Sequence, residues 1–511
     1  MGLQPVPFIL IIVNHILAPM TKNNDTSTSF FSLLKAKEQR IDWIILILSC
    51  IIGYIVLKIC YPYPATISDS GTYVHAAAED MFTFYRPFGY SYFLQIVHAI
   101  SGSIHAVFIV QTILYFFSVA AFSFVLKYVI PPISSIFWRI LLFLFVFSPV
   151  ALYMSNALMS DLLFAIMIYF MLASFIYFIK IQGWVALCLF VLSLFFALHI
   201  RYSAIMFPVL FVCFFFMVKG KMRWIGIAMT LAVTLIFYNQ VKNDMRKTTG
   251  FNQFSTGFDG WQLANNAMHV VPYIDLKPEK IKDPEMRILH QYMLTQTDVI
   301  KERTKDGSEA VAAFMWINDL PLKQFMFSYI QQTRQGYSPS WIWLGSRNYK
   351  EYGTYIISHY PLQFARYYYL PNSKEVFYPD HHEIIGKYYP INMKNVLEWY
   401  KIPEDTNMDA KYTLYSDYLD KPITISFLIT WLIIAVAAVL SIVWRKQLVW
   451  GENERKIFCI IATVGIIYYA ATTFASPVST RFWIPMNAVF FGVVYILYNR
   501  IITYKKGKNK E

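Results

Sequence analysis

The chain has 511 residues, of which 57% are hydrophobic, 18% are aromatic and only 15% are charged. A soluble domain carries about 25% charged residues, so this composition excludes an ordinary soluble protein and, with its many long apolar runs, predicts an integral membrane protein. The net charge is +13, but most basic residues cluster between apolar runs. There they are typical of topology signals rather than of a nucleic-acid partner.

The cysteines lie in or at the end of apolar runs and are not paired by spacing. We therefore predict no disulfide and no thiolate metal site. The five positions are Cys50, Cys60, Cys188, Cys213 and Cys459.

Residues 1–40 are predicted to be an N-terminal segment. The apolar stretch 5–20 carries Asn14 and His15 and is shorter than the roughly 20 residues that a spanning helix needs. It is either interfacial or upstream of the natural start. No small-residue cleavage site follows it, so we predict no signal peptide.

Ten further apolar runs predict an all-α polytopic membrane protein with about ten transmembrane helices. Seven runs form a core, residues 41–240: 42–60, 106–126, a run ending near 153, 161–177, 184–198, a run ending at 219, and 224–238. Three more close the chain within residues 421–511: 423–443, 457–474 and 482–502. Between these groups, residues 241–420 are long enough for a domain of their own, mainly α or α/β.

Basic clusters orient this topology, because cytoplasmic flanks collect Lys and Arg. Basic clusters precede the first span and follow the sixth, and single lysines, Lys127 and Lys180, follow the second and fourth. The first loop, residues 61–105, and the soluble stretch 241–420 are then predicted to lie outside the cytoplasm. We expect a multi-pass protein of a bacterial inner (plasma) membrane with its active site facing outside.

The stretch from Thr66 to Tyr90 is polar within this apolar chain, and it carries three acids, one His and one Arg. A loop that bears carboxylates between two spans is a candidate reaction site at the bilayer surface. The topology places further polar residues on the same face: Asp161, His199, Arg201 and Arg481.

These motifs resemble those of GT-C glycosyltransferases, in order and spacing. The segment Ser68–Tyr73 resembles their acidic first-loop motif, and Arg86-Pro87-Phe88-Gly89 is similar to their Arg/Lys-Pro-Pro-Gly segment. Three more segments match later motifs: Ser160-Asp161, His199–Tyr202 and Thr480–Pro485. Protein O-mannosyltransferases and the aminoarabinose transferase acting on lipid A are the most similar types. Their Asp-Glu pair is Asp69-Ser70 here, so the second acid is missing or supplied elsewhere.

The resemblance implies a glycosyltransferase that takes a sugar from a polyprenyl-phosphate donor. The acceptor is a hydroxyl of a lipid, glycan or protein on the extracytoplasmic side, and the protein itself is surrounded by membrane lipids. The catalytic acids are then Asp69, as the general base, with Asp161 and Asp80. The resemblance also implies five substrate-binding residues: Arg86, Arg201, Arg481, Tyr73 and His199. The three arginines suit the phosphate, because a guanidinium group offers it a planar fork of donors. No cofactor or metal is predicted, although a divalent ion is compatible with the chemistry.

Each of these residues also has a simpler structural interpretation. Asp69 could N-cap a helix over 70–81, and Asp161 could cap the fourth span. On such a helix Asp80, eleven residues after Asp69, returns to the same face. The arginines could be anchors at the membrane interface.

Two patterns in the soluble stretch are ambiguous. Asp380-His381-His382-Glu383 invites a metal site, but adjacent His side chains point apart and no further ligand is suitably spaced, so none is predicted. Asn265 and Asn266 either hydrogen-bond a sugar or pack a helix.

Two other functions remain open from the sequence. One is a flippase or transporter of lipid-linked saccharide, which needs polar residues deep inside its spans. The other is an O-antigen-type polymerase or ligase, which uses a diphosphate donor.

Overall fold

The computed structural model describes residues 29–67, 69–254, 257–304, 315, 317–374, 377, 393–412, 425, 428–432, 434–436, 439 and 450–508. Within these ranges the chain is helical, and the strand-like pairing there is a single parallel bridge between Ala65 and Ala157. The expectation of an all-α membrane protein is confirmed at this level. The described part of 241–420 is helical too, without the strands of an α/β domain.

Seven described helices are long and apolar enough to cross a membrane: Lys37–Cys60, Ile104–Val129, Ser135–Ser155, Ser160–Ile181, Lys221–Thr249, Glu452–Ala475 and Met486–Thr503. Two shorter apolar helices, Trp184–Ile200 and Tyr202–Phe215, lie where the fifth and sixth spans were predicted. Most of the run 423–443 falls outside the described residues, as do 1–28.

The first part of the chain forms the membrane bundle and its connecting helices. The elements are α2 (Phe30–Lys35), η1 (Lys37–Gln39), α3 (Arg40–Cys60), α4 (Ser70–Ala78), α5 (Gly89–Ile100), α6 (Ile104–Val129), α7 (Ser135–Val146), α8 (Pro149–Ser155), α9 (Ser160–Ile181), α10 (Trp184–Ile200), η2 (Tyr202–Ile205), α11 (Met206–Phe215) and α12 (Lys221–Thr249). The third span is broken between α7 and α8 because Pro149 cannot donate a helical hydrogen bond.

The later elements are a series of shorter helices and the last two long apolar helices. They are α13 (Phe258–Met268), η3 (Val271–Tyr273), η4 (Pro278–Lys280), α14 (Pro284–Thr295), α15 (Thr297–Thr304), α17 (Pro321–Thr333), α18 (Tyr337–Leu344), η5 (Gly345–Tyr349), α19 (Lys350–His359), α20 (Pro361–Phe364), η6 (Ala365–Tyr369), α21 (Leu370–Lys374), α22 (Met393–Tyr400), α24 (Glu452–Ala475), η9 (Thr480–Trp483) and α25 (Met486–Lys508).

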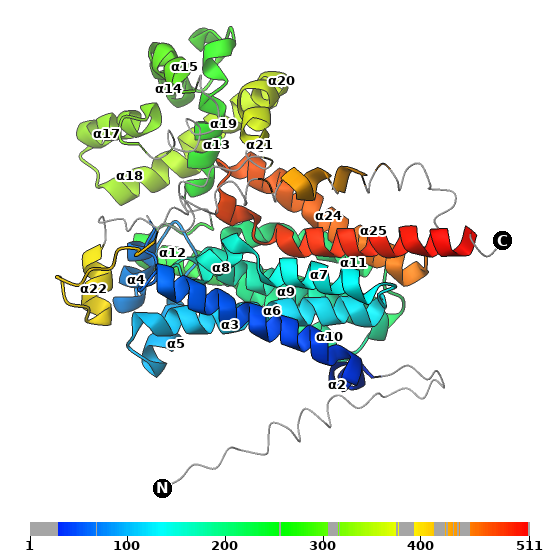
Figure 1. Ribbon diagram of the computed structural model, residues 1–511. Helices are drawn as coiled ribbons and strands as arrows, with labels where there is room; N and C mark the ends of the chain where they lie inside the picture. The colour runs from blue at the N-terminus through cyan, green and yellow to red at the C-terminus, as the bar shows by residue number, and fades with distance from the viewer. Residues whose placement is uncertain are drawn as a thin grey trace.

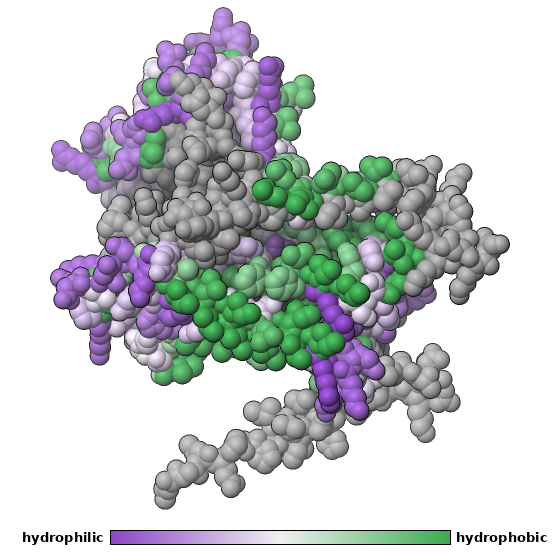
Figure 2. All heavy atoms as spheres, in the orientation of Figure 1, coloured by the Kyte–Doolittle hydropathy of each residue, from purple (hydrophilic) through white to green (hydrophobic). Residues whose placement is uncertain are grey.

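Figure 1 shows the apolar helices lying side by side, with α4, α5 and α22 at one end of the bundle and α13–α21 standing above it in this view. On the face that Figure 2 shows, hydrophobic residues predominate along the middle of the bundle and hydrophilic residues predominate on the helices above it. Helix α9 packs between α6 and α10 and is buried along most of its length. This packing holds the first turn of α9 in place, so side chains of that turn can be positioned precisely.

At the opposite end of the bundle, a buried acid links three helices. Asp42, on α3, has no exposed surface, and its carboxylate accepts hydrogen bonds from Lys127 on α6 and from Trp138 and Arg139 on α7. The Trp138 Nε1 and Arg139 Nε atoms lie 2.9 and 3.2 Å from the carboxylate oxygens. Three spans are thereby tied together through one carboxylate.

Asp42→Asn is expected to destabilise the fold by about 3 kcal/mol or more, because it leaves buried cations without their counter-ion. Asp259→Asn is the matched control, since Asp259 pairs with Lys350 where both side chains are nearly half exposed; its expected cost is below about 1 kcal/mol. Unfolding of the purified protein in detergent, followed by circular dichroism, measures both. Equal losses would contradict a locking role for Asp42.

Candidate active site

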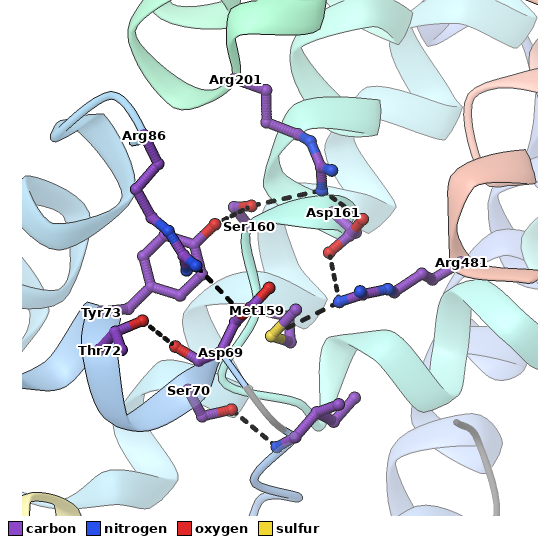
Figure 3. Close-up of polar contacts among 11 residues, drawn as sticks. Asp69, Ser70, Thr72, Tyr73, Arg86, Met159, Ser160, Asp161, Arg201 and Arg481 are labelled. Atoms are coloured by element: carbon purple, nitrogen blue, oxygen red, sulfur yellow. Dashed lines mark hydrogen bonds and ion pairs between the residues drawn. The ribbon is translucent and has the colours of Figure 1, made fainter. Parts of the chain in front are cut away.

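Four segments that are far apart in the sequence meet at one end of the bundle (Figure 3). Asp69 precedes α4, Asp161 lies in the first turn of α9, Arg201 follows α10, and Arg481 lies in η9. Each position lies in or next to a connection between the long apolar helices. The bundle therefore gathers their charged side chains in one place.

A short backbone pairing joins the first loop to the loop before α9. The Ala65 N–H donates to the Asn156 carbonyl at 2.6 Å, and the Leu158 N–H donates to the Ala65 carbonyl at 3.0 Å. Asp69 and Asp161 follow this bridge by four residues on each strand. The pairing thus holds the two acidic segments side by side.

Asp161 is shared between two arginines. Its side chain is only 2% exposed, and its Oδ1 accepts a hydrogen bond from Arg201 Nη1. Arg481 Nη1 lies 3.6 Å from Oδ2, a longer contact than a hydrogen bond. A buried carboxylate persists when it is paired in this way. The alternative that Asp161 caps α9 is wrong, because the N-cap is Met159 and no side chain caps that end.

Asp69 faces a third arginine. Arg86 Nη2 donates to Asp69 Oδ1 at 3.0 Å, and 37% of the Asp69 side chain is exposed against 2% for Asp161. The hydroxyls of Ser70 and Thr72 bond to the backbone of the turn, to the Ile67 N–H and the Asp69 carbonyl. Asp69 makes no side-chain cap of α4, so the capping interpretation is wrong and its carboxylate is turned toward Arg86.

The arginines also set the ionisation of Asp69. Burial acts to raise its pKa, but the positive charges of Arg86 and Arg481, with a smaller contribution from Arg201, outweigh burial. The pKa of Asp69 therefore lies below its ordinary value, and the group is a carboxylate at neutral pH. Figure 3 shows Asp69, Asp161 and the three arginines gathered in one place.

Arg86 is held flat between two aromatic rings. Its guanidinium carbon lies 4.4 Å from the centre of the Tyr73 ring and 4.7 Å from that of Tyr85. Stacking of this kind fixes the plane of the guanidinium group. Its Nη1 atom is buried and makes no hydrogen bond in the described part of the chain, which leaves one oriented N–H group available to a ligand.

Tyr73 connects the two acid–arginine pairs. Its hydroxyl lies 2.7 Å from Ser160 Oγ, and Ser160 Oγ lies 3.5 Å from Arg201 Nη1. Figure 3 shows Tyr73 between Arg86 and Ser160. Tyr73 was predicted to bind substrate; in the structure it ties α4 to the start of α9. Ser160 was noted only as the neighbour of Asp161, and its Ser–Asp spacing gives no hint of a tyrosine partner.

Gln111, on α6, supports the loop before α9, and it was not predicted from the sequence. Its side-chain amide donates to the carbonyls of Ser155 and Ala157, at 2.9 and 3.0 Å, and accepts from the Tyr90 hydroxyl at 3.1 Å. It therefore fixes the loop that leads into α9. A lone amide inside the apolar run 106–126 was the available signal, because buried polar side chains need partners.

Asp80 does not join the cluster. Helix α4 ends at Ala78, and Asp80 has a positive φ of 49°, so the expected helix over 70–81 is too long and the shared face is not formed. The exposed Asp80 side chain accepts a hydrogen bond from Gln95. The shared helical face was the geometric reason for a catalytic role of Asp80, and the structure removes it.

His199 is also occupied elsewhere. Its ring nitrogens contact the Phe195 carbonyl at 2.8 Å and the Gln240 side chain at 3.0 Å. The backbone of His199 packs tightly against Gly89. A Cβ atom added at Gly89 would lie 2.4 Å from the His199 carbonyl oxygen, which is too close for any other residue. Gly89 thus allows α5, and the Arg86 loop before it, to pack directly on α10.

The described residues contain no group of three or more His, Cys, Asp or Glu side chains placed to hold a metal ion. The segment Asp380–Glu383 lies outside the described residues. Comparisons with protein-family models, with curated proteins and with solved structures find no match for this chain.

Proposed function

We propose that this chain is a GT-C-type membrane glycosyltransferase that transfers a sugar from a polyprenyl-phosphate donor to an acceptor hydroxyl outside the cytoplasm. One observation carries the proposal. A partly exposed carboxylate of lowered pKa, Asp69, is paired with Arg86 and lies near Asp161 and its two arginines at the end of a bundle of apolar helices. A lipid-borne phosphate and an attacking hydroxyl need these groups at this place.

The proposed reaction uses the groups in named roles. The acceptor oxygen attacks the anomeric carbon of the sugar as Asp69 takes the hydroxyl proton. The bond between that carbon and the phosphate oxygen breaks, and polyprenyl phosphate leaves with the electron pair. Arg481 and Arg201 stabilise the phosphate charge, and the free Nη1 of Arg86 binds donor or acceptor oxygen. Asp161 positions the first two arginines and does not take the proton.

The distribution of charge in the spans disfavours a transporter. Helix α9 carries no Asp, Glu, Lys or Arg between Asp161 and Lys180, and α6 carries none before Lys127. A pathway for a phosphate or saccharide across the bilayer would need polar groups at that depth. The described charges at the bundle ends suit a reaction at one surface.

The purified chain in detergent should release polyprenyl phosphate from polyprenyl-phosphate hexoses when an acceptor extract is present, as followed by mass spectrometry. Polyprenyl-diphosphate saccharides are the comparison donor; turnover of these alone would favour the polymerase or ligase. Movement of intact donor across proteoliposomes without bond cleavage would favour the flippase and overturn the proposal.

The fall of the reaction rate at low pH reports the protonation of the general base. Because the pKa of Asp69 is lowered, its carboxylate persists as pH falls, and turnover should decline only at a pH below the ordinary titration range of an aspartate. Arg86→Gln removes the nearest positive charge, so this fall should move to higher pH. Arg303→Gln, which breaks an exposed pair with Asp319, is the control. A fall that stays at the same pH in Arg86→Gln would exclude Asp69 as the group that titrates.

A further inference from the structure

Helix α24 cannot complete its own C-terminal cap. It ends at Ala475, and the chain continues with Ser476 and Pro477. Proline has no N–H to donate, and the last four carbonyls of any helix lack partners within it. The carbonyls at this end therefore require donors from another part of the protein.

Two asparagines of the extramembrane helices supply them. Asn266, on α13, donates to the Phe474 and Ala475 carbonyls at 2.7 and 3.2 Å. Asn372, on α21, donates to the Thr473 and Ser476 carbonyls at 2.8 and 2.9 Å, and its Oδ1 accepts from the Val478 N–H at 2.9 Å. Both side chains are buried. Beside the Ser476 N–H, which donates to the Thr472 carbonyl, these carbonyls thus take their hydrogen bonds from α13 and α21.

The capped turn leads directly to Arg481. Val478, bonded to Asn372, is three residues before Arg481, and the segment beyond it is held by two tyrosines of the bundle. Tyr468 donates to the Phe482 carbonyl at 2.8 Å, and Tyr169 donates to that of Ile484 at 2.6 Å. The backbone around Arg481 is thus fixed on one side by the bundle and on the other by Asn372.

The extramembrane part also attaches to the segment that carries Asp69. The Lys411 N–H donates to the carbonyl of Cys60, the last residue of α3, at 2.8 Å. Helix α22 packs on α4, and its Trp399 ring stacks on His98 of α5 with centres 4.2 Å apart. The segment that carries Arg481 and the segment that carries Asp69 therefore both contact residues 241–420.

We propose that Asn266 and Asn372 are positioning residues, which hold Arg481 in the site through the end of α24. The extramembrane helices are then a structural part of the active site rather than an independent domain. The effect on catalysis rests on the proposed function, whereas the effect on the backbone does not. The two are tested separately.

The first test is hydrogen–deuterium exchange of the full chain in detergent. Asn372→Asp keeps the size of the side chain but turns an oxygen toward the Thr473 and Ser476 carbonyls. We expect about tenfold faster amide exchange over 473–484. Asn348→Asp is the matched control, a buried asparagine of η5; it should leave that segment unchanged. Unchanged exchange in Asn372→Asp would overturn the inference, with or without transferase activity. Asn372→Ala and Asn348→Ala replace this pair if the Asp variant does not fold.

The second test is a double-mutant cycle on donor turnover. Asn372→Asp should raise KM for the donor about tenfold in the wild-type background and less than about twofold in Arg481→Ala, because both changes remove the same contact. Additive effects would show that Asn372 does not act through Arg481. Absence of turnover in the wild type would contradict the proposed function instead, and the exchange experiment would still decide the role of Asn372.

Discussion

Asp69→Asn is expected to lower turnover by about 10²-fold or more, because it removes the only group proposed to take the acceptor proton. Asparagine keeps the shape and one oxygen for the bond from Arg86 Nη2. It cannot accept a proton at working pH. Since the Asp69 side chain is 37% exposed and caps no helix, stability should remain near that of the wild type.

Kinetics with a saturating donor separate this role from a structural one. If Asp69 merely anchors Arg86, Asp69→Asn should retain kcat and raise KM for one substrate. Glu79→Gln, an exposed acid at the end of α4, is the control and should be silent. Wild-type kcat in Asp69→Asn would return the catalytic role to Asp161 or to an acid outside the described residues.

Arg481→Ala is expected to weaken donor binding by about 10- to 100-fold, the effect of losing a hydrogen bond to a charged group. Arg481 is the better placed of the two arginines around Asp161. Its Nη1 lies 3.6 Å from Oδ2, whereas Arg201 is hydrogen-bonded to Oδ1. The longer contact of Arg481 with Asp161 is the more easily exchanged for one with a phosphate. Arg481→Lys should restore binding only in part, since lysine lacks the planar fork of donors.

The design must keep Asp161 paired. A single Arg481→Ala change leaves Arg201 on Asp161, but Arg201→Ala with Arg481→Ala would leave a buried charge alone, at a cost of about 3–5 kcal/mol. The double variant should therefore carry Asp161→Asn as well. Equilibrium binding of a polyprenyl-phosphate hexose measures the effect, with Arg303→Ala as a surface control. Unchanged donor affinity in Arg481→Ala would refute the phosphate assignment.

The sequence predicted the bundle and the gathering of its charged ends because both depend on patterns along the chain. Apolar runs set the helices, and the alternation of spans brought Asp69, Asp161, Arg201 and Arg481 to one face. The pairing of particular acids with particular arginines could not be read in this way, since it depends on packing between α4, α9 and η9. The same limit applies to the Tyr73–Ser160 contact.

Errors arose where one residue changed a local structure. The expected helix over 70–81 stops at Ala78, and the reversal at Asp80 moves that acid out of the site. For Asn266 the sequence left sugar binding and helix packing open, and the structure shows it on the backbone of α24. Pro477 was the sequence signal for that cap, but its partner lies more than 200 residues away.

The sharing of Asp161 between two guanidinium groups bears on product release. Within the described part of the chain, three positive side chains, Arg86, Arg201 and Arg481, face two negative ones, Asp69 and Asp161, so these residues together carry a net positive charge. A phosphodiester donor carries one negative charge, whereas the monoester product gains a second above about pH 6. Polyprenyl phosphate should therefore bind more tightly than the donor in alkaline buffer. Its inhibition of turnover should strengthen as pH rises through 6, and its departure should then limit the rate.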